Sequence, residues 1–138
     1  MNRKARQSLV IAALAAVLTA AGLAACAPEI KRTPVELTPL PPGDSTGVYT
    51  FTKEVSLTPA MGYSRTIAAG SQWRLIGRIS SGEVYRPMSG VFTVESAQVH
   101  EAGIVVWQGK LTGFYMLVER AFVPLNPPVA VQLVQGVK

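Results

Sequence analysis

Residues 48–58 read VYTFTKEVSLT, and the polarity of their side chains alternates along the chain. One parity carries the apolar side chains, namely Tyr49, Phe51, Val55 and Leu57, with Lys53 as the one exception. The other parity carries the polar side chains, namely Thr50, Thr52, Glu54, Ser56 and Thr58. Because successive side chains of a strand point to opposite faces, this period of two predicts a half-buried β-strand.

The same period recurs in residues 72–79, where one parity holds Trp73, Leu75 and Ile79 and the other holds Arg74, Ile76 and Arg78. Ser80, Ser81 and Gly82 are typical of a turn, so residues 83–86 are predicted to return as a hairpin partner. Pro87 either ends that strand or places it at an edge of the sheet. Further strands are predicted at residues 90–95 (continued past a bend by 97–100), 104–107, 110–118 and 129–134.

The segments between these strands carry turn signals. Gln108-Gly109 is predicted to turn a hairpin, Gly113 to form a bulge, and residues 125–128 to form a loop. The continuous apolar run 114–118 predicts a central strand that is covered on both faces. Residues 59–69 are the only segment after the leader that favours a short helical turn.

We therefore predict an all-β domain over residues 48–138, built as a small antiparallel β-sandwich or an incomplete barrel of about seven strands. Its large core side chains are expected to be Phe51, Trp73, Phe92, Trp107, Phe114 and Tyr115. The single cysteine of the 138-residue chain excludes an intrachain disulfide, so the core has to supply the stability.

The first 26 residues have a different character. Arg3, Lys4 and Arg6 precede the run LVIAALAAVLTAAGLAAC, which ends at Cys26. A basic start, a short apolar run and small residues before a break are typical of a secretory signal. The alternative is an uncleaved anchor helix with a chance cysteine, for which the run is close to the minimum length.

The end of this run, Leu23-Ala24-Ala25-Cys26, resembles the lipobox of bacterial lipoprotein precursors. The resemblance covers only residues 1–26. It implies that residues 1–25 are a signal peptide, that Cys26 becomes the lipidated amino terminus, and that palmitate-type acyl chains attach it to a membrane. Because residue 27 is alanine and not aspartate, the resemblance implies the outer membrane, facing the periplasm.

Residues 26–47 hold five of the ten prolines and are predicted to be a lipidated, proline-rich tether. In an extended conformation, residues 28–44 would span about 50 Å. The alternative to a plain spacer is a segment that docks in a groove on a partner. The formal charge of +5 is partly a property of the leader: removal of Arg3, Lys4 and Arg6 leaves ten basic and eight acidic residues.

Few residues suggest catalysis. His100 is the only histidine, and its neighbour Glu101 would point to the opposite face of a strand, so we expect a surface or loop histidine and no catalytic triad. The acidic residues are spread singly along the chain. With Cys26 lipidated, no thiolate is left for a metal, and we predict no catalytic residues, no metal site and no cofactor.

Arginine is the one polar residue type that is clustered in a single stretch of the sequence. Arg65, Arg74, Arg78 and Arg86 lie within 22 residues that contain Glu83 as the only acid. Arg74, Arg78 and Arg86 are candidate partner-binding residues, because guanidinium groups bind carboxylate and phosphate with two hydrogen bonds. The alternative is a solvated outer face. Nucleic acid is not expected, because the cell envelope is the wrong compartment for it.

These patterns favour a non-enzymatic lipoprotein of the cell envelope whose β domain binds another protein. It could be a small subunit of a secretion, conjugation or other envelope complex, with an edge strand that accepts a partner strand. An alternative is an inhibitor or immunity lipoprotein that blocks a cell-wall hydrolase or a toxin with an exposed loop at residues 80–90. A small-molecule carrier would require an apolar cavity.

Overall fold

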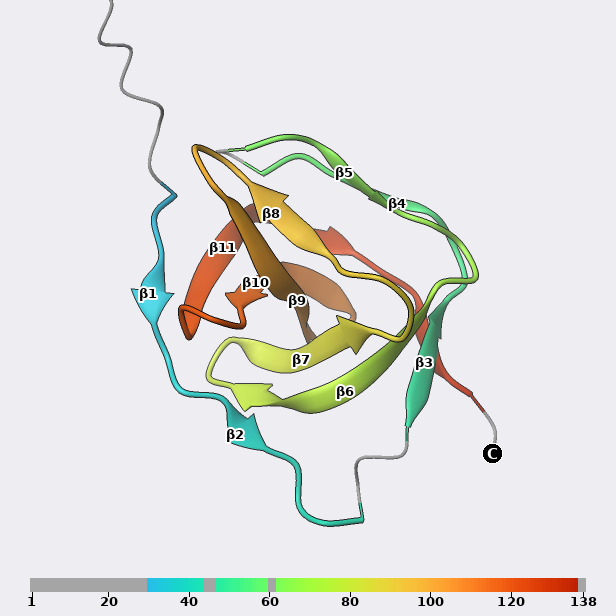
Figure 1. Ribbon diagram of the computed structural model, residues 1–138. Coiled ribbons are helices and arrows are strands. Elements are labelled where there is room, and N and C mark those ends of the chain that lie inside the picture. The colour runs from blue at the N-terminus through green and yellow to red at the C-terminus, as the bar shows by residue number, and fades with distance from the viewer. Residues whose placement is uncertain (1–29, 44–46, 60–61, 137–138) are drawn as a thin grey trace, which may run out of the picture.

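The computed structural model describes residues 30–43, 47–59 and 62–136 (Figure 1). The predicted signal peptide and Cys26 lie outside these residues. The described part of the chain has twelve strands and no helix, so it contains no helix long and apolar enough to cross a membrane. The all-β prediction is confirmed, although there are more strands than we expected.

The strands are β1 (Thr33–Pro34), β2 (Thr38–Pro39), β3 (Val48–Phe51), β4 (Val55–Leu57), β5 (Arg65–Ile67), β6 (Gln72–Ile79), β7 (Gly82–Pro87), β8 (Thr93–Glu95), β9 (Val99–Trp107), β10 (Lys110–Met116), β11 (Ala121–Ala130) and β12 (Leu133–Gln135).

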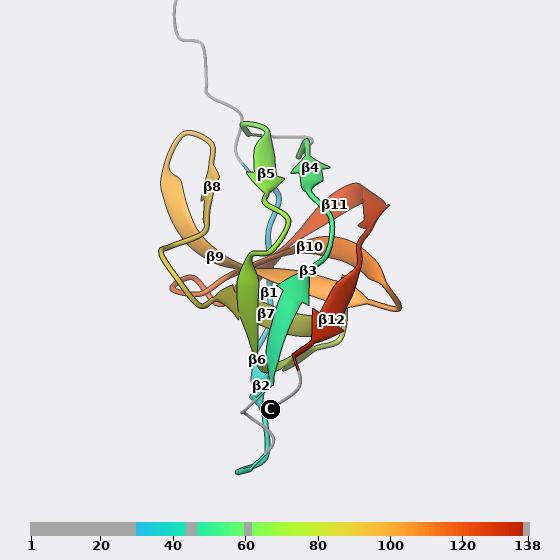
Figure 2. The same ribbon diagram turned by 90° about the vertical axis from the view of Figure 1, so that its right-hand side faces the viewer.

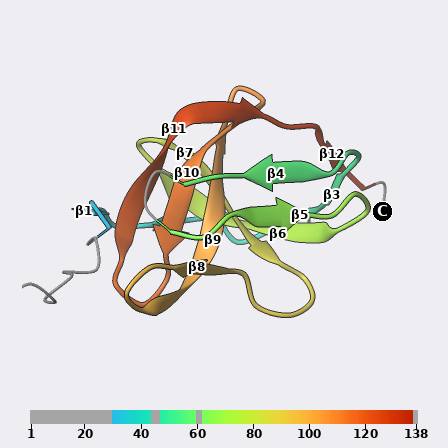
Figure 3. The same ribbon diagram turned by 90° about the horizontal axis from the view of Figure 1, so that it is seen from above.

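Ten of these strands form one antiparallel sheet with the order β1-β11-β10-β9-β7-β6-β3-β12, and β2 and β8 pair with β6 and β9. β11 pairs with β10 and β12 pairs with β3, yet only Val131 and Gln132 separate β11 from β12. One nearly continuous run therefore joins the two ends of the path. The sheet curls into a small, incomplete barrel, which is viewed along two directions in Figures 1 and 3.

Side chains of one parity fill the interior of this barrel. Four aromatic rings form a row: Phe51 contacts Trp73, Trp73 contacts Phe92, and Phe92 contacts Phe114. The ring centroids of these pairs are 5.8, 5.6 and 5.9 Å apart. The first two contacts are edge-to-face, a geometry that aromatic rings prefer. In β6, Trp73 and Leu75 face this inner core, whereas Ile79 does not belong to it, since a bulge between Leu75 and Gly77 shifts the register.

A second, smaller cluster lies on the outer face of the sheet. Its buried members come from β6, β7, β9 and β10, and they are Ile79, Val84, Val105 and Tyr115. Val35 and Leu37 pack over this cluster. They belong to residues 30–40, which we call the docked segment.

Backbone contacts hold the docked segment in place. β1 pairs with β11 and β2 pairs with β6. Between them, the Val35 N–H donates to the Arg120 carbonyl at 3.0 Å, and the Tyr115 hydroxyl donates to the Val35 carbonyl at 3.1 Å. The structure therefore differs from the free proline-rich spacer expected for this part of residues 26–47. Prolines are tolerated here because both pairings are short and lie at the edges of the sheet.

Several strand boundaries also differ from those predicted. The strand expected at 48–58 is divided into β3 and β4 by a bend at residues 52–54, which places Lys53 in solvent and removes the exception in the alternation. Residues 59–69 contain β5 instead of a helical turn. Residues 97–100 do not continue the strand before them, because Val99 and His100 begin β9.

The predicted loop at 125–128 lies within β11. The strand predicted at 129–134 is divided, because β11 ends at Ala130 and β12 begins at Leu133. The register explains this. Gly113 pairs with Pro124 but Leu111 pairs with Val129, so residues 125–128 bulge out of the ladder. The bulge predicted at Gly113 is confirmed, since both neighbours of β10 shift register between Leu111 and Gly113.

Trp107 is not a core residue, although we predicted that it would be: 55% of it is exposed. In β9, Ile104 and Val106 point to the inner core while Val105 points to the outer cluster. Trp107 has the parity of Val105, but it lies at the end of β9, beyond the cover that the docked segment provides. The central strand predicted at 114–118 is confirmed for residues 114–116, which are buried between β9 and β11.

Candidate functional site

The β9–β10 hairpin carries Trp107 to one end of the barrel. Its two-residue turn consists of Gln108 and Gly109, whose φ angles are 49° and 73°. Positive φ at both positions is the requirement of the type I′ turn, which matches the twist of a hairpin. The turn predicted from the sequence is thus present, and it holds the exposed indole at the rim of a hollow.

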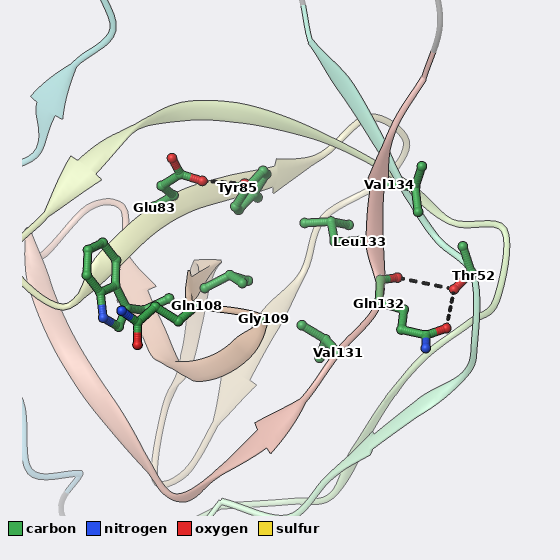
Figure 4. Close-up of a pocket in the computed structure, with 11 residues that line it drawn as sticks. Thr52, Glu83, Tyr85, Gln108, Gly109, Val131, Gln132, Leu133 and Val134 are labelled. Carbon is green, nitrogen blue, oxygen red and sulfur yellow. Dashed lines mark hydrogen bonds between the residues drawn. The ribbon is translucent and has the colours of Figure 1, made fainter.

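This hollow, which we call the end groove, has a volume of about 700 Å³. Its walls come from β7, from the β9–β10 turn, and from the run that links β11 to β12, as Figure 4 shows. It is lined by Thr52, Glu83, Tyr85, Val106, Trp107, Gln108, Gly109, Val131, Gln132, Leu133 and Val134. The mouth of a small barrel is a common place for a binding site.

The polar groups of the end groove are held in fixed positions. The Tyr85 hydroxyl donates to Glu83 Oε2 at 2.7 Å, and Arg78 Nη2 lies 3.3 Å from Glu83 Oε1. Burial, together with the Glu83 carboxylate, raises the pKa of Tyr85 far above its usual range, so the phenol stays a hydrogen-bond donor. On the opposite wall, the Thr52 hydroxyl donates to Gln132 Oε1 at 3.0 Å.

Apolar surface lies between these polar groups. Val106 belongs to the inner core, and Val131 and Leu133 pack against it. Val134, which also lines the groove, is 54% exposed. An apolar floor with a few fixed polar groups suits the binding of a ligand more than it suits bond-breaking chemistry, because Glu83 already has two partners.

The candidate arginines do not form a single patch. Arg74 and Arg86 face each other on β6 and β7 and line a hollow of about 350 Å³. Arg78 lies farther along β6, at Glu83, because a bulge between Leu75 and Gly77 shifts the register. Arg86 is already engaged, since its Nη2 lies 2.9 Å from Glu101 Oε1. Among the described residues no ion pair of Arg74 is found.

The fourth arginine of the sequence cluster has a structural role. Figure 2 shows the β4–β5 hairpin and β8 standing together beside the barrel. Arg65 of β5 donates from Nε to the Thr93 carbonyl at 3.0 Å and forms an ion pair with Glu95 of β8. Residues 80–90 were expected to form an exposed loop that could block an enzyme. Most of them form β7, which is paired with β6 and β9.

His100 is buried, with 8% of it exposed, and the prediction of a surface or loop histidine is wrong. Its Nδ1 hydrogen-bonds to Glu119 Oε1 from the turn after β10. Burial alone would raise the pKa of Glu119, but the hydrogen bond from His100, a backbone hydrogen bond and nearby positive charge outweigh it and lower the pKa. Glu119 Oε2 is buried without a hydrogen-bond partner in the described part of the chain.

Sequence reasoning recognised the Gln108-Gly109 turn but missed the groove. Glu83, Trp107 and Gln132 lie far apart in the chain. They come together because β11 pairs with β10 and β12 pairs with β3. Within residues 30–43, 47–59 and 62–136, no group of three potential metal ligands lies close together. Comparisons with protein-family models, curated proteins and solved structures found no match to this chain.

Proposed function

We propose that this protein is a non-enzymatic lipoprotein of the cell envelope, and that its β domain binds another envelope protein. A lipid on Cys26 would hold it at the periplasmic side of the outer membrane. The support for the anchor is the Leu23-Ala24-Ala25-Cys26 motif behind a basic start and an apolar run. A small subunit of a secretion, conjugation or other envelope complex fits this combination.

The observation that carries the binding function is the end groove. Trp107 and Val134 both line it and are 55% and 54% exposed, so the groove presents apolar surface to solvent. Tryptophan is also the residue type that most often dominates the energy of a protein interface. A partner seated at the end groove would remove both side chains from water.

A crosslinking experiment in cells tests this proposal. Trp107 is replaced by the photo-crosslinking residue p-benzoylphenylalanine, and Val118 is replaced in a matched control. Val118 is 77% exposed in the turn after β10 and does not line the end groove. Light should produce one covalent adduct of defined mass from position 107 and none from position 118, and mass spectrometry should identify an envelope protein in it.

Two results would count against the proposal. If position 107 gives no adduct in cells that carry the protein at its normal level, the end groove does not bind a protein there. Equal adducts from positions 107 and 118 would indicate random collisions instead of a specific interface.

A small-molecule carrier is a second candidate, favoured by one specific observation. A hollow of about 400 Å³ lies where the β4–β5 hairpin meets the start of β6, and its apolar lining includes Ile67, Trp73, Val91 and Phe92. Because the chain has two tryptophans, Trp107→Phe leaves Trp73 as the only reporter of binding. A saturable change in Trp73 fluorescence on titration with a long-chain fatty acid would support this function, and an unchanged spectrum would exclude that ligand.

A further inference from the structure

The backbone of β12 offers hydrogen bonds on one side only. Along β3, the Thr52 N–H donates to the Gln132 carbonyl at 3.1 Å and the Gly136 N–H donates to the Val48 carbonyl at 2.7 Å. Val134 lies between these two positions, opposite Thr50. Residues 132, 134 and 136 therefore face β3, and in an antiparallel ladder the residues between them face away.

Those alternate residues are Leu133 and Gln135. Their N–H and carbonyl groups point away from β3. Two residues before Leu133, the Val131 N–H points to this same side and donates to the Gly109 carbonyl at 2.9 Å. That side is where β10 pairs with β11. β10 begins at Lys110, opposite Ala130, so its pairing stops before β12 starts. Within the described residues no strand pairs with this edge of β12.

The end groove lies directly beside this edge. Leu133 and Val134 line it on one side, and Gln108 and Gly109 of the turn line it on another (Figure 4). The place that β10 would fill if it started earlier is therefore hollow, and its floor is apolar. An unpaired strand edge is a template for another strand, and here the edge and the hollow adjoin each other.

We propose that an extended segment of the partner protein adds to β12 as a strand and fills the end groove, in the place along β12 that β10 occupies along β11. This inference rests on the proposed protein-binding function and specifies its chemistry. The segment would exchange backbone hydrogen bonds with Leu133 and Gln135. Alternate side chains of the segment would point to the floor at Val106 and Leu133.

The charge of the groove specifies one further feature of the segment. Glu83 is the only charged residue among those that line the groove. Its Oε2 accepts from Tyr85 and its Oε1 is near the largely exposed Arg78, so lone pairs of the carboxylate stay open to another donor. A lysine or arginine of the segment that points inward would meet Glu83, whereas an acidic side chain there would be repelled.

The probe for this proposal is a random dodecapeptide display library, panned on the full-length protein. The selected peptides should share alternate apolar positions and one basic residue. Two N-methylated versions of the best peptide separate backbone pairing from side-chain contact, because methylation removes the amide donor. Methyl groups on one alternate set of amides should abolish binding, and methyl groups on the other set should change it less than threefold.

Matched variants of the protein test the same point from the other side. Gln135→Pro removes the N–H on the side of β12 that faces away from β3 without touching the bonds to β3, and it should weaken peptide binding at least tenfold. Gln135→Ala keeps that N–H and should bind normally. Glu83→Gln should weaken binding of the basic peptide about tenfold while leaving a peptide with a neutral residue at that position unchanged. Thermal unfolding of each variant shows whether it is folded, and the N-methylated peptides serve as the test if Gln135→Pro is not.

Several outcomes would overturn strand addition. One is a library that yields no binder, and another is binding that tolerates both N-methylation patterns and Gln135→Pro. A third is a dimer of the protein, measured by sedimentation, that Gln135→Pro dissociates, because the edge would then bind a second copy. A fourth is binding of a glycan that requires Trp107 but not the Gln135 N–H. The crosslink at position 107 is a separate readout. A crosslink without strand addition would support the protein-binding function and contradict only the strand addition. Strand addition by a library peptide without a crosslink in cells would leave the protein-binding function unsupported.

Discussion

Gln108 occupies a backbone conformation that glutamine seldom adopts. Its φ of 49° is imposed by the type I′ turn, in which asparagine and glycine are the preferred residues. A left-handed conformation is unfavourable for a residue with a long side chain, because Cβ crowds the following carbonyl. The rim of the end groove is thus built on a turn whose sequence is not optimal for stability.

We expect Gln108→Asn to raise the free energy of unfolding by about 0.5–1 kcal/mol, since asparagine tolerates the left-handed region better. Urea unfolding followed by circular dichroism measures the change. Gln98→Asn is the control, because Gln98 is exposed and has no positive φ. A destabilised Gln108→Asn variant would mean that the glutamine side chain itself supports the turn.

Glu119 makes the stability depend on pH. The pKa of its carboxyl is lowered in the folded protein, chiefly by the hydrogen bond from His100, despite the opposing effect of burial. A group with a lowered folded pKa stabilises the protein fully above its unfolded pKa, and the stabilisation is lost as the pH falls through the folded pKa. Its ordinary value is 4.5, so the loss belongs to the acidic range below it.

Glu119→Gln should therefore lower the free energy of unfolding by about 1–2 kcal/mol at neutral pH, because the charge-assisted hydrogen bond from His100 is lost. The difference from the original protein should shrink as the pH falls below that ordinary value. Urea unfolding at a series of pH values measures it. Glu36→Gln is the matched control, since Glu36 is largely exposed and lies 3.8 Å from Arg120. A difference that does not vary with pH would contradict this linkage.

At the scale of the elements, the docked segment depends on a close approach between β2 and β6. A Cβ added at Gly77 would lie 2.5 Å from the Thr38 carbonyl oxygen and 3.0 Å from the Leu37 side chain. No real side chain tolerates the first of these distances, and the obstacle is backbone. Glycine at position 77 is thus what allows β2 to lie against β6.

We expect Gly77→Ala to displace β2 and to lower the free energy of unfolding by about 1–3 kcal/mol, as overpacking does elsewhere. Hydrogen exchange measured by mass spectrometry should show that, relative to the original protein, the variant exchanges faster in residues 30–40 and at an unchanged rate in β9 and β10. Ser56→Ala, at an exposed position of β4, should leave the exchange unchanged. Uniform acceleration over all strands would show that the docked segment unfolds only together with the barrel.

The elements also show which features the sequence could predict. The alternation of residues 72–79 predicted β6 correctly, since Trp73, Leu75 and Ile79 are all buried. It did not predict the bulge between Leu75 and Gly77, after which Ile79 joins the second cluster instead of the inner core. The turn at Gln108-Gly109 is a local signal and was predicted as well. The proline run at residues 127–128 predicted a loop, but the chain stays extended there and only its pairing with β10 is lost.

The rest depended on contacts between distant segments. Trp107 has the same local pattern as a core residue, but it is the last residue of β9 and is 55% exposed. Glu101 was correctly expected to point away from His100, but no local pattern connects His100 with Glu119, which is its actual partner. Neither outcome can be read from period or spacing, since both depend on where remote strands meet.

For the whole molecule, the proposed anchor gives a direct prediction. Cells supplied with labelled palmitate should label the protein, and Cys26→Ser should abolish both the labelling and its recovery with membranes, because the acyl chains supply the attachment. Gel fluorography and membrane fractionation measure the two effects. The β domain should remain folded in the variant. Label that persists on Cys26→Ser would overturn the proposed lipidation and the localisation with it.

Under the proposed anchor at Cys26, the docked segment would also have a mechanical consequence. A pull at Cys26 would reach β1 first, whose pairing with β11 consists of two residue pairs, and then β2, whose pairing with β6 also consists of two. These contacts would peel away before β3 bears load. Release of residues 30–43 would then lengthen the connection by at most about 45 Å. The segment would act as a reserve of length that keeps the barrel close to its anchor at rest and lets it follow a moving partner under tension.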